Sequence, residues 1–266
     1  MLIVGERINT SRRQINEAVA LRDSGFIYSE VKRQLDSGAD LIDVNAGSRR
    51  DSEAEDLGWL IDVIQHEFPE VRLCIDSPNP DSLGQVLGRV NLPPMLNSTT
   101  GESARFEAMA PIIKYRECDI VALCMDDRGI PKRAGQTVEN AVRLVSKLER
   151  LGVNRQRIYL DPVIQSVSTN TQAGILAFDA TDGIRRELAG VHIISGLSNI
   201  SFGLPHRSLV NRVFLTLTMH AGLDAAILDP SDKKLMSELT AARLLLNQDP
   251  WCQAFTRAFR EGKLEP

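Results

Sequence analysis

Eight short apolar segments recur along the whole chain and constrain its fold more than any other feature. Each is rich in aliphatic and β-branched residues, is too short for a helix, and lacks the strict alternation of a half-exposed strand. Such runs are typical of parallel strands that are covered on both faces. The predicted strands cover residues 2–5, 41–44, 71–75, 94–96, 120–124, 158–160, 191–195 and 224–228.

Amphipathic stretches separate these runs. The clearest covers residues 136–151, whose apolar residues fall at helical spacing and which Gly152 follows. Segments 211–222 and 231–246 show the same pattern, and Pro80 opens a shorter helix. The chain therefore alternates predicted strands with predicted helices.

This alternation predicts βαβ units and a parallel sheet. A count of eight strands favours closure of the sheet into a (β/α)8 barrel, the TIM-barrel fold, over an open doubly wound sheet. Because no linker rich in proline and glycine interrupts the pattern, we expect one domain over residues 1–266. An extra N-terminal helix and a C-terminal helix over 251–260 are expected outside the barrel.

Composition narrows the classes of function. The 266 residues are 43% hydrophobic and carry 31 Lys and Arg against 35 Asp and Glu, a formal charge of -4 without a basic stripe for nucleic acid. We find neither a signal-peptide pattern nor a run of about 18 apolar residues, and therefore expect a cytoplasmic protein without a membrane partner. The four cysteines and four histidines lack metal-ligand spacing, so no metal site is expected.

Polar residues follow nearly every predicted strand, at the end where parallel barrels place their chemistry. Aspartate and asparagine dominate there, and no strand end carries a lysine. Such residues also cap helices and fix turns; we interpret Asp43 and Asp229 mainly as caps, and Asp161, before Pro162, also fits a turn. Barrel closure nevertheless brings several strand ends to one mouth. The residues expected to face a common ligand there are Asp76, Asn97, Asp161 and Asn199.

This set of side chains favours a particular kind of ligand. Carboxylates accept hydrogen bonds, whereas carboxamides both donate and accept them. A planar heterocycle with an amidine edge beside a carbonyl matches the set, and the 2-amino-4-oxo edge of a pterin has this form. Other chemistries lack their motifs: there is no GxxxxGK[ST] loop, Ile200 stands where a nucleophile elbow needs glycine, and no strand-end lysine could form a Schiff base.

Taken in series, eight segments resemble the methyltetrahydrofolate:corrinoid protein methyltransferases, a pterin-binding family related to the folate domain of cobalamin-dependent methionine synthase. The similarity runs nearly end to end and in order. The segments are IVGERIN (3–9), DLIDVNAG (40–47), LCIDS (73–77), LNST (96–99), YLDP (159–162), GLSNISFGLPHR (196–207), LVNRVFL (209–215) and GLDAAILDP (222–230).

The resemblance implies roles for individual residues. Those that match the family's pterin contacts are Asp76, Asn97, Asp161 and Asn199. Arg207 matches an arginine near the folate, and Glu6 matches a glutamate at the end of the first strand. Asn199 is the expected catalytic residue, because a carboxamide can donate to or accept from N5 of the pterin as charge develops there.

The implied reaction moves a methyl group between N5 of tetrahydrofolate and the cobalt of a corrinoid. It would serve acetyl-CoA synthesis, which consumes 5-methyltetrahydrofolate, or a corrinoid-dependent demethylase system, which produces it. Tetrahydrofolate or 5-methyltetrahydrofolate is thus expected as substrate, and a homodimer as the assembly.

Cobalamin is expected on a separate corrinoid protein, because the D-x-H-x-x-G signature of cobalamin-carrying domains is absent. Its nearest approach is His192, which we interpret as a core histidine. Two other functions stay open. A synthase of the dihydropteroate type is one, although residues 224–230 lack the arginine and histidine of that family's last strand; a non-catalytic folate-binding subunit is the other.

Overall fold

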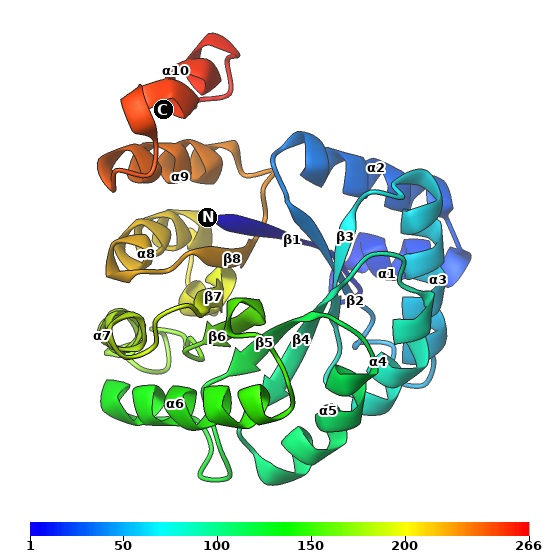
Figure 1. The fold of residues 1–266 in the computed structure, drawn as a ribbon. Helices are drawn as coiled ribbons and strands as arrows, with labels where there is room; N and C mark the ends of the chain where they lie inside the picture. Colours follow the sequence, from blue (N-terminus) through cyan, green and yellow to red (C-terminus); the bar gives the residue numbers. More distant parts are fainter. Residues whose placement is uncertain (266) are drawn as a thin grey trace.

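The computed structural model describes residues 1–265 and shows eight parallel strands closed into a barrel in sequence order (Figure 1). The last strand pairs with the first, with Ala225 beside Leu2 and Leu228 beside Gly5. The predicted TIM barrel is confirmed, and every predicted strand is present. The strands are β1 (Leu2–Asn9), β2 (Leu41–Asn45), β3 (Arg72–Asp76), β4 (Met95–Thr100), β5 (Asp119–Leu123), β6 (Ile158–Asp161), β7 (His192–Gly196) and β8 (Ala225–Leu228).

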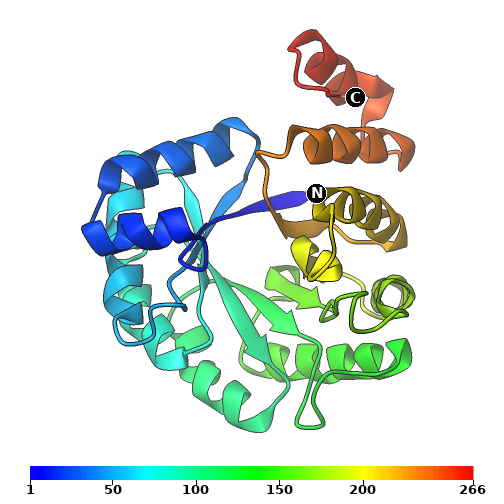
Figure 2. The same ribbon diagram turned by 180° about the vertical axis from the view of Figure 1, so that it is seen from behind.

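Helices surround the barrel. Figure 1 shows α1 to α5 on one side and α6 to α9 on the other, and Figure 2 shows from behind that α10 lies outermost, beyond α9. The two additional helices expected at the ends of the chain are thus α1 and α10. The helices are α1 (Arg13–Leu21), α2 (Ser24–Asp36), α3 (Glu53–Glu67), α4 (Pro80–Val86), α5 (Ser103–Tyr115), α6 (Ala134–Arg150), α7 (Ala173–Glu187), α8 (Arg207–Ala221), α9 (Lys233–Leu245) and α10 (Gln253–Arg260).

The interior of the barrel is filled by a compact apolar cluster below its mouth. Because successive side chains of a strand point to opposite faces, every second residue of each strand points inward. Each strand gives one buried residue to the cluster, which makes it a packed floor rather than a pore. The eight residues are Val4, Leu41, Cys74, Met95, Val121, Tyr159, Ile194 and Ala225.

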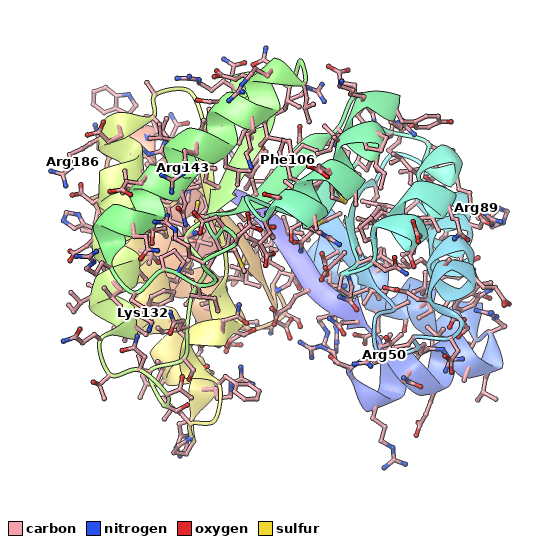
Figure 3. The ribbon with its side chains drawn as sticks, turned by 90° about the horizontal axis from the view of Figure 1, so that it is seen from below. Arg50, Arg89, Phe106, Lys132, Arg143 and Arg186 are labelled. Atoms are coloured by element: carbon pink, nitrogen blue, oxygen red, sulfur yellow. The ribbon has the colours of Figure 1, made fainter. Side chains whose placement is uncertain are left out.

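A second core lies between the strands and the helices, as α6 illustrates. Leu144 and Leu148 are buried against the barrel, whereas Val142, which we expected on the same apolar face, is 40% exposed. Its position two residues before Leu144 places it about 200° around the helix, on the outward side. Figure 3 shows charged side chains such as Arg143 and Arg186 on the outside of the helical layer.

Two strands extend further than their apolar runs. β1 was expected to end at residue 5 but runs to Asn9, because Ile8 and Asn9 still pair with Val44 and Asn45 of β2. β4 likewise runs to Thr100. Strand pairing therefore holds several of the polar residues that follow the apolar segments. None of the helices in residues 1–265 combines the length and the apolar character that crossing a bilayer requires.

Candidate functional site

A cavity of about 620 Å³ opens above the apolar floor, at the C-terminal ends of the strands. All eight strands contribute to its walls, together with segments that follow β1 and β7, so no local segment forms it alone. The lining residues are Glu6, Asn9, Ser11, Arg12, Asp43, Asp76, Asn97, Ser98, Leu123, Asp161, Gly196, Ser198, Asn199, Arg207 and Ile227.

The structure brings all six predicted site residues to this cavity. Asp76 and Asp161 are the last residues of β3 and β6, Asn97 lies within β4, and Glu6 lies within β1. The remaining two follow β7: Asn199 lies in a 3-10 turn over Leu197–Ser201, and Arg207 is the first residue of α8. Residues separated by 201 positions in sequence, Glu6 and Arg207, thus share one cavity because the barrel closes.

Asp76 is held by an amide from the neighbouring strand. The Asn45 side chain donates a hydrogen bond of 2.7 Å to its Oδ2, and Asn45 in turn accepts from the backbone N–H of Gly47 at 2.9 Å. Burial raises the pKa of Asp76 to about 6, against the effect of that hydrogen bond. Asn45 is not among the predicted site residues, and its place in the DLIDVNAG segment is the one sequence signal for it.

Asp161 both fixes a turn and lines the cavity, as its sequence position allowed. Its Oδ1 accepts a 2.7 Å hydrogen bond from the backbone N–H of Val163, which fixes the turn after β6. The same carboxyl lines the cavity, and burial raises its pKa to about 6. Val163 has a left-handed φ of 62°, unusual for a β-branched residue, so the Asp161 bond stabilises a strained turn beside the site.

The interpretation of Asp43 as a helix cap is wrong. Asp43 is the third residue of β2, 2% exposed, and its inward-facing side chain lines the cavity. Burial, followed by the nearby Asp76 carboxylate, raises its pKa well above the usual value. Strand pairing extends past Asp43 to Asn45, so no helix begins there for it to cap.

Asp229 partly fits its interpretation as a cap. Its Oδ1 accepts from the backbone N–H of Ser231 at 3.0 Å, which fixes the turn before α9, but Asp232 is the residue that caps that helix. Its other oxygen accepts a 2.6 Å hydrogen bond from Arg7. Asp229 therefore links the ends of β1 and β8 and is not among the residues that line the cavity.

Asn199 lies at the wall of the cavity with its side chain exposed. Across residues 1–265 the structure shows no hydrogen bond that ties its carboxamide to another side chain. Gly196 makes room for it, since a Cβ at that position would lie 3.1 Å from Asn199 Nδ2. A carboxamide that is close to the cavity and not held by the protein can turn its oxygen or its nitrogen toward a ligand.

Two arginines lie at one side of the mouth. Arg207 donates to the backbone oxygen of Ser198 at 2.6 Å, and its guanidinium lies 5.8 Å from the centre of the Phe202 ring. Arg12, which sequence reasoning did not single out, donates to Glu6 at 3.4 Å. Burial raises the pKa of Glu6, although Arg12 opposes the shift. A ligand with a negatively charged group would place that group on this side.

His192 is not the core histidine that we expected. It is the first residue of β7, at the opposite end of the barrel from the cavity, and its side chain is 39% exposed. The ring stacks on Tyr159 at 4.7 Å, and its Nδ1 lies 3.1 Å from Asp224 Oδ2. His192 therefore belongs to the polar lower rim, far from the candidate site.

The donor set of the cavity defines its chemistry. Four carboxyls and three carboxamides line it, together with hydroxyl groups and two arginines, and neither lysine nor histidine appears among the lining residues. Within residues 1–265, no group of histidine, cysteine, aspartate and glutamate has the arrangement of a metal site. The cavity is suited to a planar, nitrogen-rich molecule that donates several hydrogen bonds from one edge.

Comparison with known proteins agrees with this description. Residues 5–229 match the sequence model of the family described as pterin binding enzyme. The methylcorrinoid:tetrahydrofolate methyltransferase of Eubacterium limosum is 35% identical over 268 residues, which cover 100% of this chain and 98% of that one. The chain therefore belongs to the pterin-binding enzymes, and its resemblance to the corrinoid methyltransferases is confirmed.

More distant relatives share the fold or one domain. Methionine synthase of Mycobacterium leprae is 27% identical over 244 residues, which are 87% of this chain but only 20% of that protein. Dihydropteroate synthase of Burkholderia cenocepacia, solved with 7,8-dihydropteroate, superposes with a TM-score of 0.69 at 18% identity and covers 93% of each chain. At this identity the likeness to dihydropteroate synthase shows the fold alone.

Proposed function

We propose that this chain is a methyltransferase that moves a methyl group between N5 of tetrahydrofolate and the cobalt of a corrinoid carried by a separate protein. The observation that carries the proposal is the convergence of Asp76, Asn97, Asp161 and Asn199 on one cavity. The 35% identity with a methylcorrinoid:tetrahydrofolate methyltransferase over nearly all of both chains supports it.

The polar residues that line the cavity suit the pterin ring. An ionised Asp76 can accept from the ring N–H and the 2-amino group together, while Asn97 and Asp161 take further polar atoms of the ring. Orientation matters because the methyl group, N5 and the acceptor must lie in line for displacement. These three residues would therefore bind and orient the substrate without taking part in the transfer of charge.

Asn199 is the proposed catalytic residue. When the methyl group leaves N5, the tertiary amine is a poor leaving group unless a hydrogen bond or a proton stabilises the charge that develops on it. The Asn199 carboxamide has no competing hydrogen bond in residues 1–265 and can donate or accept, so it can assist transfer in either direction. This role needs no proton from Asn199 itself.

The direction we propose runs from the methylcorrinoid to tetrahydrofolate, as in a corrinoid-dependent demethylase system. The name of the Eubacterium limosum relative gives the methylcorrinoid as donor and tetrahydrofolate as acceptor, which supports this direction over acetyl-CoA synthesis. We further propose that the enzyme works in the cytoplasm as a homodimer, and light scattering of the purified protein would measure that assembly.

Two other functions are less well supported. A dihydropteroate-type synthase must bind the pyrophosphate leaving group, yet β8 ends in Ile227 and Leu228 and contributes no basic side chain to the cavity. A folate-binding subunit without catalysis would have no need of Asn199, whose side chain stands free beside the ring-binding set.

One assay separates these functions. The purified chain is incubated with methylcobalamin and tetrahydrofolate, and in parallel with dihydropterin pyrophosphate and p-aminobenzoate. We expect 5-methyltetrahydrofolate from the first mixture and no dihydropteroate from the second. Dihydropteroate formation would overturn the proposal, and tight folate binding without turnover would favour the non-catalytic subunit. The purified protein should also be colourless, because the corrinoid is carried by a partner. Stoichiometric cobalt in the preparation would contradict this division.

A further inference from the structure

Arg105 occupies a position that its own helix disfavours. It is the third residue of α5, at the end where the aligned peptide dipoles place a partial positive charge, so a cation there costs stability. Within residues 1–265 its guanidinium forms no ion pair with a carboxylate that would offset this cost. A side chain that local preferences disfavour is expected to have a tertiary contact or a function in compensation.

The partners of Arg105 are backbone carbonyl groups at the mouth of the barrel. Its Nη2 donates to the backbone oxygen of Ser98 at 2.6 Å and to that of Ser77 at 3.1 Å. Its Nη1 donates to the backbone oxygen of Pro78. Ser77 and Pro78 directly follow β3, whereas Ser98 lies in β4. One guanidinium therefore bridges two chain segments at the mouth.

This bridge lies where the regular pairing of β3 and β4 stops. Their last paired residues are Asp76 and Asn97, and one backbone hydrogen bond of 3.0 Å follows, from the Ser77 N–H to the Asn97 oxygen. The register of β4 against β5 then shifts between Asn97 and Thr99, and such irregularities change the direction of side chains. Among the side chains of residues 1–265, only Arg105 joins the segment after Asp76 to the segment after Asn97 by hydrogen bonds.

We propose that Arg105 is a positioning residue of the pterin site, which holds the ends of β3 and β4 together so that Asp76 and Asn97 face the same ligand. This inference rests on the proposed function, because it assumes that these two residues bind the substrate. Arg105 does not line the cavity, so it acts through them. Arginine suits this role, because a planar guanidinium presents its donors in fixed directions, whereas a lysine ammonium is a point charge on a flexible stem.

Arg116 offers a matched control on the same helix. It directly follows the last residue of α5, and its guanidinium also donates to three backbone oxygens, those of Leu87, Val90 and Asn91. These residues precede β4, so they lie at the opposite end of the barrel from the cavity. A purely structural role predicts that the two arginines behave alike. A positioning role predicts that only Arg105 affects ligand affinity.

The test compares Arg105→Met with Arg116→Met, since methionine keeps a long unbranched side chain and removes the guanidinium. Both variants should lower the melting temperature by about 2 to 4 °C. Arg105→Met should raise the Kd for tetrahydrofolate by about tenfold, whereas Arg116→Met should keep the wild-type Kd. At saturating tetrahydrofolate, the single-turnover rate of Arg105→Met should stay within about threefold of wild type, because Asn199 lies in a different segment.

Arg105→Lys tests the geometry of the bridge. It keeps the positive charge but not the planar set of donors, so its Kd should lie between those of the wild type and Arg105→Met. A wild-type Kd for Arg105→Lys would show that charge alone suffices and would overturn the inference. It is also overturned if Arg105→Met binds as tightly as the wild type, or if it loses rate at saturation by as large a factor as affinity.

An equal loss of affinity in Arg116→Met would likewise overturn the inference, because the effect would then be a general one of destabilised strands. Should Arg105→Met fail to fold, Arg105→Gln is subject to the same criteria. If the wild type itself does not bind tetrahydrofolate, the proposed function fails, which is a separate result.

Discussion

Carboxylates at the lower end of the barrel are paired with arginines, whereas three buried carboxyls at the mouth are not. At the lower end, where the strands begin, Asp119 accepts a 2.6 Å hydrogen bond from Arg72, and Asp224 lies 2.9 Å from Arg185. At the mouth, Asp43, Asp76 and Asp161 form no ion pair within residues 1–265, although all three are buried or nearly so.

The pKa shifts follow from this difference. Burial by itself would raise the pKa of Asp224. Hydrogen bonds from His192 and the backbone of Ile193, together with the charge of Arg185, outweigh burial and lower that pKa. Burial without a cation raises the pKa of Asp161 to about 6. The lower end thus pairs its carboxylates with arginines for stability, whereas Asp76 and Asp161 at the mouth accept hydrogen bonds from uncharged protein groups and keep further acceptor positions for a ligand. Mutations at the two ends should have opposite effects.

The largest effect is expected at Asn199. Asn199→Ala should lower the rate of methyl transfer by roughly 10²- to 10³-fold, because it removes a hydrogen bond aimed at the charge that develops on N5. The Kd for tetrahydrofolate should change much less, since the ring-binding residues remain. Single-turnover kinetics and equilibrium binding separate the two quantities.

The control for this variant is Asn91→Ala, which removes an exposed asparagine that does not line the cavity. It should leave both the rate and the Kd near their wild-type values. If Asn199→Ala loses rate and affinity by the same factor, Asn199 is a binding residue and the catalytic role is wrong.

A matched pair of charge removals tests the comparison directly. Asp161→Asn keeps an acceptor for Val163 but removes the negative charge, and it should raise the Kd for tetrahydrofolate by roughly 10- to 100-fold. Its melting temperature should not fall, because a buried carboxylate without a cation is replaced by a neutral amide.

Asp224→Asn makes the same chemical change at the lower end. It should reduce the free energy of unfolding by on the order of 1 kcal/mol, since the contact with Arg185 is partly exposed, and leave the Kd unchanged. Thermal or denaturant unfolding and ligand titration measure the two effects. If both variants lost stability and kept affinity, the mouth carboxylates would be structural and the contrast between the two ends would not exist.

The sequence allowed most of the fold to be predicted because barrel strands are local features. A buried parallel strand needs a short apolar run, and such runs at residues 41–44 and 120–124 can be recognised without tertiary information. The ends of the strands were harder to predict. β1 continues through Glu6 and Arg7 because β2 lies beside it, and no local signal shows that pairing.

Position at a predicted strand end indicates most of the site residues, whereas only the family resemblance indicates Arg207. Asp76 and Asp161 terminate β3 and β6, so barrel closure alone brings them together. The prediction of Asp43 as a helix cap is wrong because a cap and an inward-facing strand residue look alike in sequence, and only the strand register distinguishes them. Arg12 reaches the cavity from the segment between β1 and α1, and that position depends on tertiary packing.

The smallest predicted effect is the pH dependence of stability in the ligand-free protein, which should differ between the carboxyls at the two ends of the barrel. Asp76 and Asp161 have pKa values of about 6 in the folded chain against an ordinary value of 3.8. Between about pH 4 and pH 6 the folded state therefore binds more protons than the unfolded state, so these two groups make stability fall as pH rises through that window. Asp224, whose folded pKa is lowered, contributes in the opposite sense at lower pH.

Ligand binding should show the reverse dependence at the mouth. A protonated Asp76 cannot accept from the ring N–H and the amino group together, so the Kd for tetrahydrofolate should rise as pH falls below about 6. Melting temperature and Kd measured from pH 5 to pH 8 on the same preparation test both slopes. Asp161→Asn should weaken the pH dependence of both the melting temperature and the Kd, because one of the two titrating groups is gone. Asp224→Asn should leave the pH dependence of the Kd unchanged. A Kd that is independent of pH across this range would mean that the mouth carboxyls do not receive the ring's donors, and the ends of the barrel would then differ in stability alone.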